Sequence, residues 1–342
     1  MGTNLKDLIA AKEITFEDLK GKILAVDSFN ILYQFLSTIR QRDGTLLKDS
    51  QGRVTSHLTG LFNRTTKLMQ YGIKLAFVFD GKPPELKQKE REKRRTVKQE
   101  AIKLYEEAKK KEDIEAMKKY AARTSILTSE MIEESKRLIS ALGLPVIQAP
   151  SEGEAQVASI VNEQKAFAGI SEDFDSLLYG IPRLVKNLTI SGRRKFKASY
   201  VNIKPKIIHL SDNLNNLGID QDQLIVLAML IGTDYNQGGI KGIGPKNAFK
   251  LVKKYQNNFD DLFNEVKWDE QFNFPWTDIY YLIKKMPVKK DCDLTFEKIN
   301  TEKISELLIE EHDFSKERVN KAIENLIKNE DKKQQKGLGE WF

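Results

Sequence analysis

Cysteine and histidine are nearly absent from this chain of 342 residues. A single cysteine, Cys292, excludes an internal disulfide and any cluster of thiolate metal ligands. The three histidines, His57, His209 and His312, lie far apart in the sequence and form no HExxH pattern. Any catalytic chemistry is therefore expected to depend on carboxylates rather than on thiolate or imidazole groups.

Long apolar runs are also missing. No stretch approaches the roughly 20 apolar residues of a membrane span, and the opening segment carries acids throughout without an apolar core before a cleavage site. With 40% hydrophobic and 31% charged residues, the composition is that of a globular protein. We expect a protein that stays inside the cell and does not enter a membrane. The length allows one large or two ordinary domains.

The net charge of +7 is unevenly distributed along the chain. Residues 82–111 contain 12 Lys and Arg against 6 Glu, and residues 181–206 contain 8 Lys and Arg and no acid, so the remainder carries a net charge of −7. A basic segment is typical of a polyanion partner, although a charged run can also be a solvated helix face. An acidic body rich in Asp indicates bound cations.

Four short apolar runs predict buried parallel strands, because each is followed by a helical pattern. The runs cover residues 22–26, 74–79, 145–147 and 166–170. Each ends in acids or leads into them: Asp27, then Asp80, then Glu152 and Glu154, then Asp173 and Asp175. In parallel sheets with right-handed crossovers, ligands bind beyond the carboxyl ends of the strands. The fold class is therefore expected to be α/β, with a central, mostly parallel sheet and helices on both faces.

Acids gathered at one sheet edge repel one another and raise one another's pKa unless cations neutralise them. Oxygen ligands without His or Cys favour Mg²⁺, with Mn²⁺ as a substitute. Two such ions about 4 Å apart can stabilise the attacking and leaving oxygens of phosphodiester hydrolysis. The sequence therefore predicts a divalent metal site.

Each acid also has a purely structural interpretation. Asp27 and Asp80 are residues that often begin a helix or a turn, and Ser151 to Glu154 fits a capping box. Such a structural explanation must be invoked separately at every strand end, whereas one metal site explains why acids stand at all of these ends.

Two helical regions are predicted to contact nucleic acid. A long charged helix from Glu85 to about Tyr120 places Lys87 and Arg94 two turns apart on one face, near Asp80, where a cationic face can grip a phosphate. The pattern of residues 220–255 predicts a helix, a glycine hairpin and a second helix. Its loop amides and lysines suit a sugar–phosphate backbone, and its head carries Asp234. Exposed helices and a plain helical hairpin are the structural alternatives.

The end of the chain carries an apolar motif. The helical pattern is expected to end near Lys328, and the polar residues after it predict a flexible linker. Leu338, Trp341 and Phe342 then follow at i, i+3 and i+4, the spacing of a short peptide that docks in a partner's groove. A disordered tail is the alternative.

Seven motifs, in order, resemble the flap endonucleases of archaea and eukaryotes over almost the whole chain. They are AVDSFNILYQFL, RQRDGTLLKDSQGRVTSHLTGLFNRT, FVFDGKPPELK, APSEGEAQ, SEDFDSLLYG, GTDYNQGGIKGIGPKNAFKLVKKY and QKGLGEWF. The resemblance implies a monomeric, structure-specific 5′ nuclease that removes flaps from branched DNA. The absence of a basic extension after the last motif is more similar to archaeal members, which implies a cytoplasmic, nucleoid-associated enzyme; a eukaryotic member would be nuclear.

The resemblance also assigns roles to residues. It implies that one metal is held by Asp27, Asp80, Glu152 and Glu154, and the other by Asp173, Asp175 and Asp234. It implies transition-state contacts from Lys87 and Arg94, base stacking on Tyr33, and an N-terminal amine at Gly2 near the active site. The hairpin resembles a helix-two-turn-helix element that binds duplex DNA, often with K⁺, through Gly238, Gly239, Gly242, Gly244 and Lys246. Gln335, Leu338, Trp341 and Phe342 resemble a sliding-clamp peptide.

The expected organisation is one nuclease domain over residues 1–328 and a tail over 329–342, with the clamp motif at 335–342. Within the domain we expect an N-terminal part over about 1–98, a helical arch over about 82–128 and an internal part over about 116–258.

Two residues depart from the family pattern: Glu172 stands where Gln is common, and Phe174 where Tyr is common. A gap or Holliday-junction nuclease, a related RNase and a non-catalytic DNA-binding scaffold remain alternatives.

Overall fold

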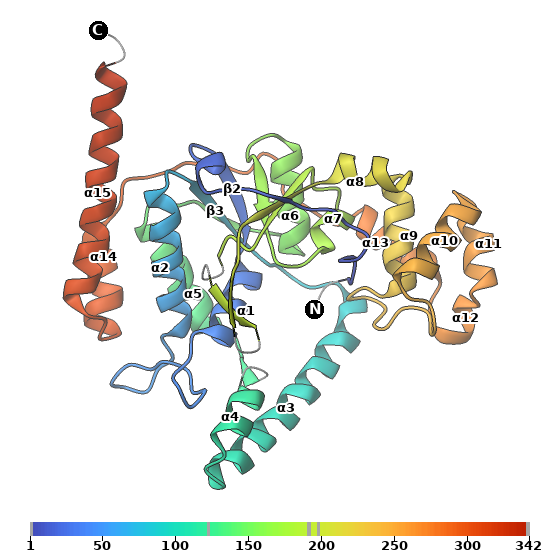
Figure 1. Ribbon diagram of the computed structural model, residues 1–342, viewed down its shortest axis with the longest axis horizontal. Coiled ribbons are helices and arrows are strands. Elements are labelled where there is room, and N and C mark those ends of the chain that lie inside the picture. Colours follow the sequence, from blue (N-terminus) through green and yellow to red (C-terminus); the bar gives the residue numbers. More distant parts are fainter. Residues whose placement is uncertain (1–2, 122–123, 190–192, 197–198, 340–342) are drawn as a thin grey trace.

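A seven-stranded mixed sheet forms the centre of the molecule in the computed structural model, which describes residues 3–121, 124–189, 193–196 and 199–339 (Figure 1). The strand order is β1-β9-β6-β5-β2-β3-β4. The five strands from β6 to β4 are parallel, β9 is antiparallel to β6, and β1 is antiparallel to β9. The prediction of a mostly parallel sheet is confirmed.

The observed strands match the four predicted runs and add strands at one side. The sheet contains β1 (Lys12–Glu13), β2 (Ile23–Asp27), β3 (Lys74–Phe79), β4 (Val146–Gln148), β5 (Ala168–Ile170), β6 (Arg183–Lys186) and β9 (Lys206–His209). A separate antiparallel pair consists of β7 (Arg193–Phe196) and β8 (Ser199–Asn202). Those two strands lie within the basic segment 181–206.

Helices cover both faces of the sheet, because successive strand residues point to opposite sides. Leu24 and Val26 of β2 belong to one apolar core, and Ala25 to the other. The first core is covered by η1 (Glu17–Leu19), α1 (Ser28–Thr38), α2 (Ser56–Gln70), α5 (Ser129–Ala141), α14 (Thr301–Ser305), η4 (Glu306–Glu311) and the start of α15 (Lys316–Gly339). The second contains residues of α6 (Gly153–Asn162), α7 (Asp175–Leu178), α8 (Leu210–Leu217), α9 (Gln221–Ile231), α10 (Pro245–Tyr255), α11 (Phe259–Glu265), α12 (Trp268–Gln271) and α13 (Trp276–Lys284). No helix among the described residues is both long and apolar enough to cross a membrane.

The charged helical region after β3 forms an arch that projects from the sheet (Figure 1). It consists of η2 (Glu85–Lys87), α3 (Gln88–Lys110) and α4 (Ile114–Ala121), and α3 and α4 pack side by side. The expected single helical stretch to about Tyr120 is therefore interrupted. Glu112 has a left-handed φ of 54°, and the Asp113 carboxylate accepts a hydrogen bond from the Ala116 amide at 3.0 Å, which starts the second helix.

The predicted glycine hairpin between two helices is confirmed. Helix α9 begins with a capping box between Asp220 and Gln223, and α10 begins with Gly244 at its N-cap and Pro245 in its first turn. Gly239 has a φ of 58°, and a Cβ there would lie 2.3 Å from the backbone carbon of Ile231. Glycine is therefore required for the turn to close against the end of α9.

Helix α15 continues to Gly339, which corrects the expectation of a flexible linker after Lys328. The residues from Asn329 to Lys336 include no Gly or Pro and are mostly Lys, Gln, Glu and Asp, so their polarity does not end a helix. The helix extends away from the body of the molecule (Figure 1). The side chains of Gln335 and Leu338, and all of Trp341 and Phe342, lie outside what the structure describes, so the clamp motif stays a prediction.

A network of buried histidines joins the loop before α2 to the C-terminal helices. His312 Nδ1 lies 3.0 Å from Asp49 Oδ2, and His312 Nε2 lies 3.2 Å from Glu134 Oε1. The other oxygen of Glu134 contacts His57 Nε2 at 3.0 Å, and Arg53 Nε donates to Asp49 Oδ2 at 2.7 Å. Neither histidine side chain is exposed to solvent. The histidines are therefore part of the fold, at a distance from the acids that follow the strands.

We expect Asp49→Asn to lower the melting temperature at neutral pH and to have no effect in strong acid. Burial raises the pKa of Asp49, but hydrogen bonds from His312 and Arg53 more than offset this and lower it to about 2, from 3.8. A carboxyl whose pKa is depressed by folding stabilises the native state above its unfolded pKa, and this contribution is lost as the pH falls towards 2. Thermal unfolding followed by circular dichroism between pH 7 and pH 2 tests this, with exposed Asp7→Asn as the control. A constant difference between Asp49→Asn and wild type at all pH values would contradict the role of this charge.

Candidate active site

The six acids predicted from the strand ends and Asp234, predicted from the head of the hairpin, all line one cleft of about 840 Å³. Each is placed there by the end of a strand or by the start of a helix or turn. Asp27 ends β2, Asp80 follows β3, Glu152 and Glu154 begin α6, Asp173 and Asp175 follow β5, and Asp234 lies in the turn after α9. Since β2 lies between β5 and β3 in the sheet, the acids of these three strands meet at one edge. The sequence prediction that they converge is confirmed.

Of the purely structural roles considered for these acids, the helix cap at Asp27 is present and the capping box at residues 151–154 is not. The Asp27 side chain accepts a hydrogen bond from the Asn30 amide at 3.1 Å and caps α1, so this residue is both a cap and a member of the cleft. The capping box at residues 151–154 does not form. Glu152 itself is the N-cap of α6, its side chain makes no capping hydrogen bond, and the Ser151 hydroxyl donates instead to the Lys82 carbonyl at 3.0 Å.

The environment of the cleft disfavours carboxylate charge. Burial, followed by repulsion from Asp80, raises the pKa of Asp27 to about 8. Burial and repulsion from Glu152 raise the pKa of Asp80 to about 6, and burial and Asp175 raise the pKa of Glu154 well above its ordinary value. Such shifts are the signature of acids that need a cation nearby, and they are common at functional sites.

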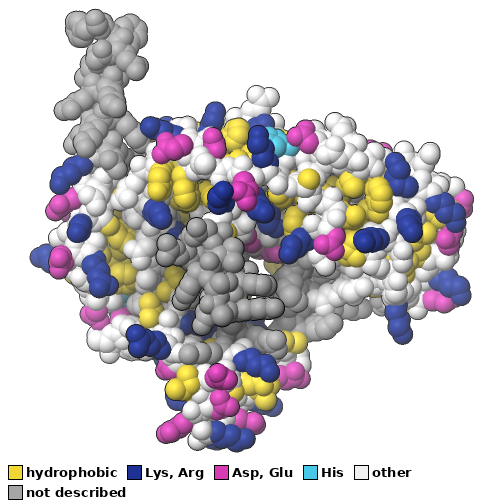
Figure 2. All heavy atoms as spheres, viewed as in Figure 1, with side chains coloured by type: hydrophobic (Ala, Val, Ile, Leu, Met, Phe, Trp, Pro, Cys, Tyr) yellow, Lys and Arg dark blue, Asp and Glu magenta, His cyan; other side chains and the backbone are white. Residues whose placement is uncertain are grey.

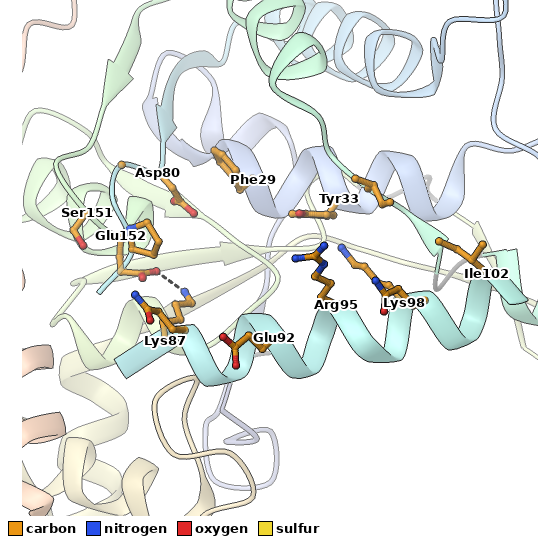
Figure 3. A pocket seen from close by; sticks show the side chains of 15 residues that line it. Phe29, Tyr33, Asp80, Lys87, Glu92, Arg95, Lys98, Ile102, Ser151 and Glu152 are labelled. Atoms are coloured by element: carbon orange, nitrogen blue, oxygen red, sulfur yellow. Dashed lines mark hydrogen bonds and ion pairs between the residues drawn. The ribbon is translucent and has the colours of Figure 1, made fainter. Parts of the chain in front are cut away.

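Lys87 supplies one positive charge from the start of the arch. Its ammonium lies 2.6 Å from Glu152 Oε2 (Figure 3) and 3.2 Å from Asp234 Oδ2, so it joins acids from two separate elements. Although burial lowers the pKa of Lys87, Glu152 and Asp234 raise it above its ordinary value. The lysine is therefore charged, and its head is directed into the cleft as the sequence predicted.

A second hollow of about 980 Å³ continues from the cleft beneath the arch. Tyr33 of α1 lines both, is 38% exposed, and has the ammonium of Lys98 at 5.0 Å from its ring centre. Arg95 and Lys98 point from α3 towards Tyr33 (Figure 3). Arg94 lies on α3, but its side chain is outside the described part of the structure, as is Gly2. The Tyr33 ring thus lies in the passage between sheet and arch, next to the Lys98 ammonium.

The first half of the hairpin lines the cleft, through Gly232, Thr233, Asp234, Gln237 and Gly238. Its second half lies outside this lining: Gly239, Gly242 and Gly244 form the turn leading to α10, and Lys246 is exposed in the first turn of that helix. Lys and Arg side chains are spread over the lobe of α10, α11 and α12 on the right of Figure 2. The hairpin is therefore placed to extend the site outward from the cleft.

Three residues that orient the acids were not identified from the sequence. Asn30 Nδ2 donates to Asp173 Oδ2 at 2.9 Å, and the Ser171 hydroxyl lies 3.3 Å from Glu154 Oε1 and 3.4 Å from Asp27 Oδ2. The amide of Gly153 donates to Asp80 Oδ1 at 2.8 Å. The one signal in the sequence was that these residues stand next to the acids, in SFN, SEDFD and SEGE. Their residue types alone indicate nothing, because Asn, Ser and Gly are common in turns everywhere.

The donor set fits a hard divalent cation. Its members are carboxylate oxygens without imidazole or thiolate, and burial together with mutual repulsion raises the pKa of Asp27, Asp80 and Glu154, which a nearby cation would counteract. Among the described residues, no group of three or more acidic or histidine side chains is arranged to enclose a metal by itself. An ion here is therefore expected to keep waters or to share phosphate oxygens with a bound substrate, as Mg²⁺ usually does.

The fold and the acidic cleft define a nuclease of the XPG class. The XPG N-terminal domain family matches residues 3–101, and the XPG I-region family matches residues 143–234. Flap endonuclease 1 of Staphylothermus marinus is 51% identical over the full length of both chains, and that of Pyrococcus horikoshii is 47% identical over 100% of this chain and 98% of the relative. The chain belongs to the flap endonuclease family.

Solved structures agree with this assignment. Flap endonuclease-1 from Methanococcus jannaschii has a TM-score of 0.77 at 39% identity, covering 97% of this chain and 100% of that one. The catalytic core of Rad2 in complex with a DNA substrate has a TM-score of 0.70 at 25% identity, covering 95% and 100%. Human GEN1 with Holliday junction DNA, at 20% identity and a TM-score of 0.67, shares the fold.

We expect Gly153→Ala to disable the cleft while the protein stays folded. The added Cβ would lie 2.4 Å from Asp80 Oδ1, so the carboxylate or the start of α6 has to move. Misplacement of a reacting group by about 1 Å can cost a factor of about 100 in rate. Calorimetric titration with Mn²⁺ should show weaker binding, and cleavage of branched DNA should slow. Gly244→Ala, where an added methyl meets no atom within 4 Å, is the control for metal affinity; equal affinities in both variants would contradict the prediction.

Proposed function

We propose that this protein removes 5′ flaps from branched DNA by metal-dependent hydrolysis of a phosphodiester bond, with 5′–3′ exonuclease activity on nicked DNA. The observation that carries the proposal is the convergence of seven carboxylates in a single cleft beside an arch, with the Lys87 ammonium between two of them. A scaffold that only binds DNA does not need acids there, since acids repel phosphate. The flap endonuclease relatives support the choice of branched DNA as substrate.

The acids would hold two divalent ions, Mg²⁺ with Mn²⁺ as a substitute. Asp27, Asp80, Glu152 and Glu154 would serve one ion, and Asp173, Asp175 and Asp234 the other. These ions, when bound, would activate a water and stabilise the charge that develops on the phosphate oxygens. The carboxylates would also repel the substrate wherever no ion lies between them and the DNA, which favours a phosphate in one position.

Basic and aromatic groups of the arch side would orient the substrate. Lys87, from its position beside Glu152, would donate to the scissile phosphate as charge develops there, with Arg94 beside it on α3. Tyr33 offers a ring face for a base next to the scissile bond, a contact worth about 1–3 kcal/mol. The amides and lysines of the hairpin from Gly238 to Lys246 would hold duplex DNA by its backbone, with a K⁺ ion if the turn binds one.

End-labelled DNA tests the proposal. Wild-type protein should cut a double-flap substrate when Mg²⁺ is present, and not when it is chelated; single-stranded and four-way-junction DNA should be poor substrates. Asp175→Ala should reduce the single-turnover rate at least a thousandfold while keeping DNA affinity within about threefold, because the acid serves metal rather than DNA. Faster cleavage of the four-way junction than of the flap would instead favour a Holliday-junction nuclease, and cleavage of RNA alone a related RNase.

We also propose that the last residues, 335–342, bind a sliding clamp that encircles DNA. Gln335 would hydrogen-bond at the rim of a pocket, and Leu338, Trp341 and Phe342 would fill it. Helix α15 carries the backbone of residues 335–339, the described part of this motif, away from the body of the protein, which suits a docking element. The enzyme would act as a monomer, held near its DNA by the clamp and, in an archaeal cell, associated with the nucleoid.

Removal of residues 335–342 should leave flap cleavage unchanged in isolation but abolish stimulation by the clamp. A peptide of this kind binds in the micromolar range, about −8 kcal/mol, and the tether raises the local concentration of enzyme at the DNA. Calorimetry of the peptide with the clamp of the same organism measures the contact directly. Full stimulation of the truncated protein would contradict the proposal.

A further inference from the structure

Lys186 is a second lysine next to the acids, and the proposed mechanism does not use it. It ends β6, which lies parallel to β5 with Ile170 paired to Val185, so the next residue of each strand, Ser171 and Lys186, lie side by side. This places the lysine beside the turn that carries Asp173 and Asp175. Unlike Lys87, it is not among the residues that line the cleft.

The head of Lys186 is held against the back of this turn. Its ammonium donates a hydrogen bond to the backbone carbonyl of Glu172 and lies 3.5 Å from the centre of the Phe174 ring. The next residue, Asn187, has a left-handed φ of 62° and donates its amide to Glu172 Oε1 at 2.7 Å. Both contacts hold Glu172 away from the cleft, and the lysine touches residues on either side of Asp173.

The same contacts explain the two departures from the family pattern. Glu172 does not act as an additional ligand, because its carboxylate is engaged by the Asn187 amide and lies in the field of Lys186. Phe174 contributes its ring face, which receives the ammonium, and this contact does not involve the hydroxyl that a Tyr would add. The cation and the ring together close the outer side of the turn.

We propose that Lys186 is a positioning residue that fixes the 171–175 turn, so that Asp173 and Asp175 are held ready for the second metal ion. This inference rests on the proposed function only in assigning a metal to those acids. Asn30 Nδ2 donates to Asp173 Oδ2 at 2.9 Å, and the Thr3 amide donates to Asp175 Oδ1 at 2.7 Å. The turn is thus held by several groups, and Lys186 is one that the sequence motifs did not reveal.

Two opposite effects of the lysine can be separated by experiment. If its charge alone mattered, removal would strengthen metal binding, because one competing cation near the acids would be gone. If its contacts position the turn, removal weakens metal binding, and loss of such outer contacts typically costs about tenfold or more in metal affinity. The proposal requires the second result.

Mn²⁺ titration of the full-length protein without DNA, followed by calorimetry and electron paramagnetic resonance, distinguishes them. Lys186→Met should bind at least one Mn²⁺ about tenfold more weakly, whereas Lys186→Arg, which keeps the charge and can donate to the same carbonyl, should stay within about twofold of wild type. Lys204→Met, an exposed lysine of the same basic segment, is the matched control and should not change Mn²⁺ affinity. Unchanged or tighter binding in Lys186→Met would overturn the proposal, and so would an equal loss in the Met and Arg variants.

A cleavage measurement gives a second, independent readout. Lys186→Met should need about tenfold more Mg²⁺ for its half-maximal single-turnover rate on a double-flap substrate, with DNA affinity in chelator unchanged. If the Met variant does not fold, Phe174→Leu removes the ring beneath the ammonium and should weaken Mn²⁺ binding about threefold, and wild-type affinity in that variant would overturn the proposal. A wild-type protein that binds Mn²⁺ without cleaving DNA would contradict the proposed function and leave the test of Lys186 intact.

Discussion

Repulsion among carboxylates buried at one edge of a sheet is the constraint on which the rest of this structure depends. Burial and neighbouring charge raise the pKa of Asp27 to about 8 and that of Asp80 to about 6, so nearby positive charge favours the ionised form of both. Lys87 provides one charge within the cleft, and Lys186 stands behind it. The acids therefore have to be held by other groups, and Asn30, Ser171 and the Gly153 amide do so.

The elements around the sheet each approach this edge from a different side. The arch brings Lys87, Arg95 and Lys98 across from Tyr33, and the hairpin after α9 brings Asp234 and Gly238. The C-terminal helices pack on the face that carries α1, α2 and α5, where His312 ties them to Asp49. The cleft thus lies where the arch, the sheet and the hairpin meet, which suits a substrate that bends or branches there.

Much of the site was predictable because it follows strand ends. The acids after residues 22–26, 74–79 and 166–170 were placed correctly, since parallel strands bring their carboxyl ends to the same edge whatever connects them. The break in the arch at Glu112 and the helical course of residues 329–339 were not predicted. The helical course agrees with the helix preference of Lys, Gln and Glu, but these residues are also common in linkers, so polarity alone was misleading. The break depends on the left-handed backbone of one residue, Glu112, which no periodicity displays.

By itself, the sequence determined the fold class, the acids that meet in the cleft and, through motifs in a fixed order, the family. Only the tertiary structure decided which groups touch. The ammonium of Lys87 bridges Glu152 and Asp234, which are 82 positions apart, and Lys186 braces the turn of Asp173 from the neighbouring strand. The reason is physical: periodicity reports which face a residue takes within its own element, whereas contacts between elements are set by sheet register and packing, which no local pattern encodes.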